Sequence, residues 1–170
     1  GQGVGMFGAS WLVSRGKGLG SLRRDFGLVV RVRDWPWLAA GVLFQVAALG
    51  AVEVLQRASG DQSSAQETVR VLERASGTEM LVAILGVALL APLVEELLFR
   101  GLLLRALLRR TNAGTAVAIS GGLFAAAHLL DPGAAIVLAP LLALGVVSGT
   151  RAVRTGELSQ SVLLHMGFNL

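Results

Sequence analysis

Six polar residues stand out inside apolar segments because their types and spacing could support the activation of water. They are Glu95, Glu96, Arg100, His128, His165 and Asn169. A carboxylate in apolar surroundings binds a proton more tightly than one in water, so it can take a proton from water near neutral pH. A histidine can hold the same water, bind a metal or steady an oxyanion, and an amide can donate to a developing oxyanion. These residue types therefore indicate hydrolytic chemistry.

Glu95 and Glu96 lie between two long apolar runs whose periodicity predicts a helix, bent near Gly86 or Pro92. On a helix Glu96 and Arg100 are four residues apart and can form an ion pair. Glu95 points about 100° away and has no partner in its own segment. The alternative is a purely structural ion pair, or a helix end at the water surface. Charges placed this deep in apolar sequence are costly and are usually functional.

The composition is typical of a membrane protein folded as a single bundle. Of 170 residues 54% are hydrophobic and 15% are charged, whereas ordinary soluble domains carry roughly 25% charged residues. The absence of cysteine excludes disulfides, thiolate metal sites and a cysteine nucleophile. The net charge of +4 comes from arginines clustered between apolar runs. That pattern indicates a lipid bilayer as partner and no nucleic acid, which would require one continuous basic face.

We expect an all-α fold, a polytopic transmembrane helical bundle. The predicted helices cover residues 35–55, 78–108, 115–130, 134–147 and 158–170. Basic clusters at 15–33, 105–110 and 151–154 alternate with mixed or acidic connections at 56–79 and 131–133. Assigning the basic clusters to the cytoplasm gives an in–out alternation over five spans. The spans after the first are short, so we expect tilting or local thinning of the bilayer.

Three segments follow from this topology. Residues 1–34 are interpreted as the end of a truncated first span plus a basic cytoplasmic segment, and 35–78 as a transmembrane helix and a polar loop. Residues 79–170 form the predicted catalytic core, truncated at its C-terminus. The basic segment is either a short surface-lying element or a disordered linker. Within the polar loop, residues 69–74 predict a short amphipathic helix.

The ionisable groups of three helices are expected at a similar depth. At about 1.5 Å per residue, Glu95 lies ~15–22 Å from its basic helix end, His128 ~20 Å from Gly114, and His165 ~14 Å from Gly156. This agreement predicts one shared site. The alternative for either histidine is a simple bond to a backbone carbonyl.

Glycines and serines in the second half of the chain indicate packing rather than further chemistry. Gly121, Gly122 and Gly145 are interpreted as close helix-packing points and not as a phosphate loop. No serine has a base at the spacing of a serine–histidine–aspartate set.

Three motifs in order carry a resemblance to a known family. They are Glu95-Glu96-Leu97-Leu98-Phe99-Arg100, the pair Phe124 and His128, and the pair His165 and Asn169. Each motif is weak alone, but the three together on apolar helices are specific. The sequence resembles the CAAX prenyl protease and bacteriocin-processing family, also called the ABI or CPBP intramembrane proteases. The resemblance covers roughly residues 81–169 and extends to Gly27-Leu28.

The resemblance implies a multi-pass protein of the cell membrane, in bacteria the inner or plasma membrane. The implied activity is that of a membrane-embedded glutamate-type endopeptidase acting on a membrane-associated peptide or protein. By this resemblance Glu95 activates water with His128. His165 and Asn169 bind or polarise the scissile carbonyl.

The same resemblance implies supporting roles and raises the question of a metal. Glu96 and Arg100 would be structural or assisting. The family is described as zinc-dependent, which implies zinc or another divalent metal on His128 and His165. The sequence has no His-Glu-x-x-His motif, so the ligands would have to come from three helices, and sites with and without a metal both stay open.

Two other functions fit buried charges in a membrane protein. One is a non-catalytic protein in bacteriocin self-immunity or partner scaffolding. The other is a small ion or proton transporter, which is less favoured because no inverted repeat is visible. The substrate, and whether prenylation is recognised, do not follow from the sequence.

Overall fold

The computed structural model describes residues 8, 11–12, 14–16, 18–59, 77–130 and 134–170. These residues form helices and turns and contain no strand, which confirms the all-α class. Most of the apolar segment at 1–13, the expected amphipathic helix at 69–74 and the expected turn at 131–133 lie outside the described residues.

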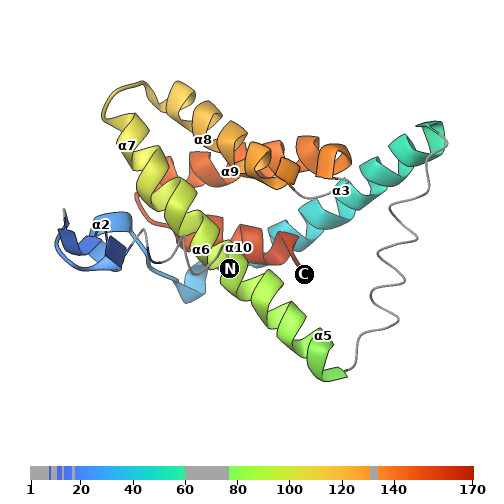
Figure 1. The fold of residues 1–170 in the computed structure, drawn as a ribbon, viewed down its shortest axis with the longest axis horizontal. Coiled ribbons are helices and arrows are strands. Elements are labelled where there is room, and N and C mark those ends of the chain that lie inside the picture. The colour runs from blue at the N-terminus through green and yellow to red at the C-terminus, as the bar shows by residue number, and fades with distance from the viewer. Residues whose placement is uncertain (1–7, 9–10, 13, 17, 60–76, 131–133) are drawn as a thin grey trace.

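Figure 1 shows the order of the described helices along the chain. The α-helices are α2 (Leu22–Phe26), α3 (Pro36–Ser59), α5 (Gly77–Ile84), α6 (Ala91–Glu96), α7 (Leu104–Leu108), α8 (Ala113–Ala127), α9 (Leu138–Thr155) and α10 (Ser159–Phe168). Two π-helical segments are η2 (Leu85–Leu90) and η3 (Leu97–Leu103). Three short 3₁₀ helices are η1 (Val32–Asp34), η4 (His128–Leu130) and η5 (Ala134–Val137).

The central helix is one continuous rod, in which α5, η2, α6, η3 and α7 join end to end (Figure 1). Its irregular part lies where the sequence predicts a bend, because η2 contains Gly86 and Pro92 stands at the start of α6. Proline has no N–H for the carbonyl one turn back, so a regular α-helical ladder cannot continue through it. The two glutamates therefore lie at the end of a short α-helix between two π segments, a geometry common at functional sites.

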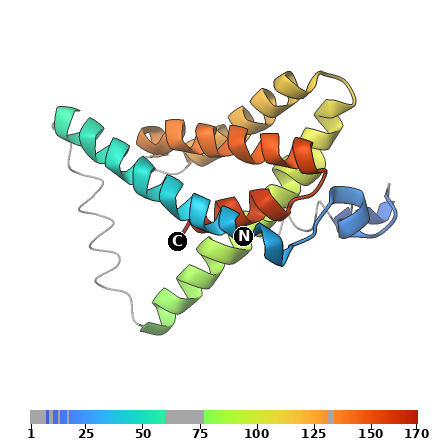
Figure 2. The ribbon, with the colours of Figure 1, turned by 180° about the vertical axis from the view of Figure 1, so that it is seen from behind.

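The last helix, α10, lies at the centre of the fold and packs against α3, α6 and α9, while α8 runs along α9 (Figures 1 and 2). Two glycines, Gly121 and Gly145, let α8 and α9 approach each other closely. A Cβ on Gly145 would lie 2.9 Å from the Gly121 Cα, so the predicted packing role of both is confirmed. The same prediction is wrong for Gly122, where a Cβ would have nothing within 4 Å.

The apolar run predicted at 134–147 continues as the helix α9 to Thr155, just after Arg151 and Arg154, the residues that mark its end in the sequence. Its last turns stay helical because Arg151 has partners on the protein. The Arg151 Nε donates to Gln160 Oε1 over 2.8 Å, and the guanidinium lies 4.6 Å from the Trp37 ring centre. Gly156 then ends the helix in the left-handed conformation, with φ of 69°.

Two apolar clusters meet at the segment η3. One contains Leu97, Leu104 and Val162, and the other contains Phe124 and Leu164 together with Phe99. The side chains of η3 therefore belong to both clusters, and η3 lies between the two. The buried residues of η3 are Leu97, Phe99, Arg100 and Gly101, so its one charged residue is among them.

The segment before α3 is a short packed element, as one of the two sequence alternatives proposed. Ser21 caps α2, and Gly27 ends it with φ of 69°. Phe26 is buried against Gly101, and the Leu158 N–H donates to the Gly27 carbonyl over 2.8 Å. The basic segment is thus attached to the bundle through residues 22–31 and 157–159.

Two described helical stretches, Val32–Ala58 and Ala135–Thr155, are long and apolar enough to cross a membrane. The stretch Ala113–Ala127 is apolar but shorter. Large apolar side chains along α3 face outward, Leu43 and Val54 among them. Such continuous apolar surface is typical of contact with lipid or another protein. The in–out alternation over five spans stays a prediction.

Candidate active site

Three side chains from two distant segments form the buried centre of the candidate site. Glu96, Arg100 and His165 are each at most 1% exposed. The Arg100 Nη1 lies 3.0 Å from Glu96 Oε1, which confirms the ion pair predicted from their spacing. The His165 Nδ1 lies 3.0 Å from the same oxygen and forms a hydrogen bond with it. An ionised Glu96 accepts this bond, so the ring donates through Nδ1 and its orientation is set.

The guanidinium of Arg100 joins three helical elements. Its Nη2 donates to the Gly145 carbonyl of α9 over 3.1 Å, and its Cζ lies 4.5 Å from the Phe124 ring centre of α8. With Glu96 on its own rod, the cation has a carboxylate, a carbonyl and an aromatic face as partners. These contacts replace part of the solvation that burial removes.

Glu95 has a different environment from its neighbour. Its Oε2 lies 3.7 Å from His165 Nε2, beyond hydrogen-bond distance, and its side chain is 21% exposed whereas that of Glu96 is sealed. His128 lies within electrostatic range of the same carboxyl group. The structure therefore brings Glu95 and both imidazoles, from three helices, to one location. Of the charged residues described there, Glu95 is partly open to solvent, whereas Glu96 and Arg100 are buried.

Phe124 holds the two histidines. Its ring makes edge contacts with His128 at 5.0 Å and with His165 at 5.3 Å between centroids. Its backbone carbonyl also accepts from His128 Nδ1 over 2.9 Å. This is the carbonyl contact that the sequence left open as an alternative for a lone histidine. It also directs the other ring nitrogen, Nε2, away from the helix.

Asn169, at the end of α10, reaches the rod. Its Nδ2 donates to the Val87 carbonyl in η2 over 2.9 Å. An amide nitrogen carries two hydrogens, so one donor remains for another acceptor. The sequence places Asn169 one turn after His165, but the partner at Val87 does not follow from it.

Several acceptors in this site are backbone carbonyls that sequence reasoning missed. They are those of Val87, Gly145 and Phe99, the last of which accepts from the Ser120 hydroxyl over 2.9 Å. A carbonyl carries no residue-type signature. A close glycine pair such as Gly121 and Gly145 is the one sequence signal that could have indicated where the backbone of α9 becomes reachable.

The described residues do not fit a preformed metal site. Among them no three histidine, aspartate or glutamate side chains are arranged to hold a metal ion. The His165 Nδ1 is engaged by Glu96, and the His128 Nδ1 by a carbonyl.

Comparison with known families places these residues in a recognised group. A family model described as type II CAAX prenyl endopeptidase Rce1-like matches residues 77–170, more than half of the chain. The chain belongs to this family. The Rce1-like match spans all three motifs and confirms the resemblance found in the sequence. The family is one of membrane proteases. No curated protein and no solved structure gives a significant match.

Proposed function

We propose that this Rce1-like chain is an intramembrane endopeptidase that hydrolyses a peptide bond of a membrane-associated substrate with water activated by Glu95 and His128. The observation that carries the proposal is the contrast between the adjacent carboxylates. Glu96 is sealed and paired with Arg100, whereas Glu95 is partly open and faces an imidazole. One carboxylate is thus committed to structure, and the other is available for chemistry.

In this proposal Glu95 is the general base. Its exposed fraction allows a water molecule to approach, and its apolar surroundings favour transfer of a proton from that water. His128 shares the water through the Nε2 that its Phe124 contact leaves free. The resulting hydroxide attacks the carbonyl carbon of the scissile bond and gives a tetrahedral intermediate. Its collapse breaks the C–N bond, and the proton that Glu95 took from water passes to the leaving amine.

His165 and Asn169 are proposed to bind or polarise the scissile carbonyl oxygen. The His165 Nε2 is not within hydrogen-bond distance of Glu95, and Asn169 retains one amide hydrogen. Donors held in place before the reaction stabilise the charge that develops on the oxygen. The Glu96 contact to Nδ1 holds the His165 ring in this position.

Glu96 and Arg100 are proposed as positioning residues. They do not face the open side of the site, but together they hold His165 and the α8–α9 pair around it. The remaining elements of the proposal are the multi-pass topology over five spans, the catalytic core at 79–170, and a bacterial inner or plasma membrane. Their support is the alternation of basic clusters and the apolar outward faces.

The proposal is tested by cleavage in reconstituted liposomes. The purified chain is mixed with a library of membrane-anchored peptides, and the products are identified by mass spectrometry. Glu95→Gln and His128→Ala should each lower the rate by about 10²–10⁴-fold while expression and helix content persist. The matched control is Glu53→Gln, at an exposed glutamate paired with Arg57, which should cleave at the wild-type rate.

Two outcomes would redirect the assignment. Wild-type rates from both site variants would refute proteolysis by this site. Protection of cells from a peptide toxin that survives both substitutions would favour the self-immunity or scaffolding function, which needs no catalysis.

A further inference from the structure

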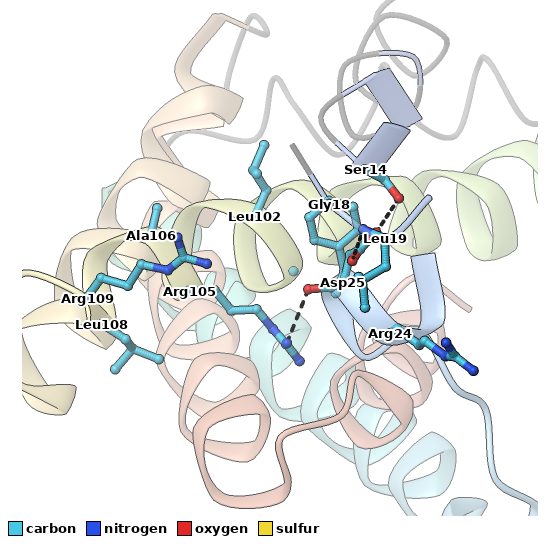
Figure 3. A pocket seen from close by; sticks show the side chains of 12 residues that line it. Ser14, Gly18, Leu19, Arg24, Asp25, Leu102, Arg105, Ala106, Leu108 and Arg109 are labelled. Atoms are coloured by element: carbon cyan, nitrogen blue, oxygen red, sulfur yellow. Dashed lines mark hydrogen bonds between the residues drawn. The ribbon is translucent and has the colours of Figure 1, made fainter. Parts of the chain in front are cut away.

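A cavity lies away from the candidate active site, between α2 and the η3–α7 part of the rod (Figure 3). Its volume is about 660 Å³. Three of its lining residues are arginines, namely Arg24, Arg105 and Arg109. Its apolar lining includes Leu19, Leu102 and Leu108. The cavity therefore combines a cationic lining with an apolar wall.

The one carboxylate in this cavity does not neutralise the arginines. Asp25 accepts from the Ser14 hydroxyl over 2.5 Å and from the backbone N–H groups of Leu19 and Ser21 over 2.8 and 3.1 Å (Figure 3). The hydrogen bond from Ser14 is the largest cause that lowers the pKa of Asp25 below its ordinary value. The carboxylate stays ionised but is turned toward its own loop. Its hydrogen bonds to Ser14, Leu19 and Ser21 hold the loop that forms this wall of the cavity.

The three arginines differ in whether their guanidinium groups form hydrogen bonds within the described part of the protein. Arg105 donates through Nη2 to the Gly156 carbonyl over 2.7 Å and through Nη1 to the Asp25 carbonyl over 3.3 Å, so it holds the walls together. Arg24 and Arg109 are exposed, and their guanidiniums form no hydrogen bond or ion pair with any described residue. Figure 3 shows them on opposite sides of Arg105, one from α2 and one beyond α7. Within the described part of the chain, neither charge is neutralised by a partner.

We propose that this cavity binds the headgroup of an anionic phospholipid. Arg24 and Arg109 would each donate charge-assisted hydrogen bonds to anionic headgroup oxygens on their own side of Arg105, because their planar forks match phosphate oxygens. The acyl chains would leave along Leu102 and Leu108 on the outer face of the rod. A basic cluster at the end of an apolar helix meets anionic lipid where headgroups and hydrocarbon adjoin. The binding is independent of the proposed proteolysis.

The test compares two double variants of equal charge. Arg24→Gln/Arg109→Gln removes the two free cavity arginines, and Arg23→Gln/Arg110→Gln removes their exposed chain neighbours, which do not line the cavity. The full chain in phosphatidylcholine nanodiscs is titrated with phosphatidylglycerol, and binding is measured by native mass spectrometry and by thermal shift. Arg105 is left unchanged because of its structural contacts.

We expect binding of phosphatidylglycerol to weaken by roughly tenfold or more in the cavity variant and by less than about threefold in its matched control. Equal losses in both would show a general attraction to negative membranes and overturn the proposal, as would no loss in either. Inorganic phosphate at the same concentration should give no shift. If inorganic phosphate alone raised the melting temperature as much as phosphatidylglycerol does, the ligand would be a free anion and not a lipid, and the proposal would be overturned. If the double variant does not fold, Arg109→Gln against Arg110→Gln gives the same comparison.

Discussion

Arg100 and Arg109 lie on or just beyond the same helical rod, yet their guanidiniums have opposite surroundings. Arg100 is 1% exposed and contacts a carboxylate, a carbonyl and an aromatic ring. Arg109 is exposed and has no ion-pair partner among the described residues. A buried cation must recover its lost hydration from fixed partners, whereas an exposed one keeps water and can exchange it for a ligand. Arg100 therefore holds the residues of the candidate active site in place, whereas Arg109 can exchange its water for a ligand at the cavity.

The largest effect should come from removing the buried cation. Arg100→Met leaves the Glu96 carboxylate buried without its partner, so we expect a loss of about 3–5 kcal/mol in the free energy of unfolding. Arg109→Gln should change it by less than about 0.5 kcal/mol. Denaturant titration in detergent measures both. The double variant Glu96→Gln/Arg100→Met should recover much of the loss, and equal stabilities of the two single variants would contradict the contrast.

A smaller effect is expected where α9 presents its carbonyl to Arg100. In Gly145→Ala the new Cβ would lie 2.9 Å from Gly121 Cα, so the helices must separate, at a cost of roughly 1–3 kcal/mol. Gly122→Ala is the matched control on the facing helix, because its Cβ meets nothing within 4 Å. It should be neutral or stabilise by up to about 1 kcal/mol. Thermal unfolding followed by circular dichroism compares the two, and an undisturbed Gly145→Ala would mean that the close crossing is not required.

The exposed ion pair of Arg31 and Glu157 should contribute weakly and only above acidic pH. A hydrogen bond from Arg31 lowers the pKa of Glu157 below its ordinary value of 4.5. A carboxyl group with a lowered folded-state pKa contributes stability above its unfolded pKa and loses it as the pH falls through the folded value. The melting temperature of Glu157→Gln should therefore lie slightly below that of wild type near neutral pH. This difference in melting temperature should vanish in acid. A difference that grows in acid would contradict the predicted pH dependence.

The smallest effect is expected from chelators. The buried cluster is held by a guanidinium, and the described residues contain no preformed group of metal ligands. EDTA or 1,10-phenanthroline should leave both the melting temperature and the cleavage rate unchanged. A chelator-sensitive rate restored by zinc would mean that the side chains around Glu95 rearrange to bind it.

The sequence predicts best those features that depend on local spacing. The four-residue interval fixes the Glu96–Arg100 ion pair on any helix, and the tryptophan–proline start of α3 is a local signal as well. The similar depth estimated for the ionisable groups of three helices predicts that Glu95 and His165 lie close together, and their side chains do so in the structure. These predictions require only helical geometry and the hydrophobic pattern.

The missed features depend on contacts between distant segments. Arg151 and Arg154 mark the end of α9 in the sequence, but the contacts of Arg151 with Gln160 and Trp37 do not follow from it. Gly122 cannot be told from Gly121 without knowing which face meets α9. The π-helical segments likewise have no signature in local composition.

The contact between Glu96 and His165 joins residues 69 positions apart, and the histidine is the later one. A ribosome therefore delivers the carboxylates long before the imidazole that orients beside them. In the proposed mechanism the growing chain therefore has no complete site before α10 is made, and it should not cleave neighbouring peptides before then.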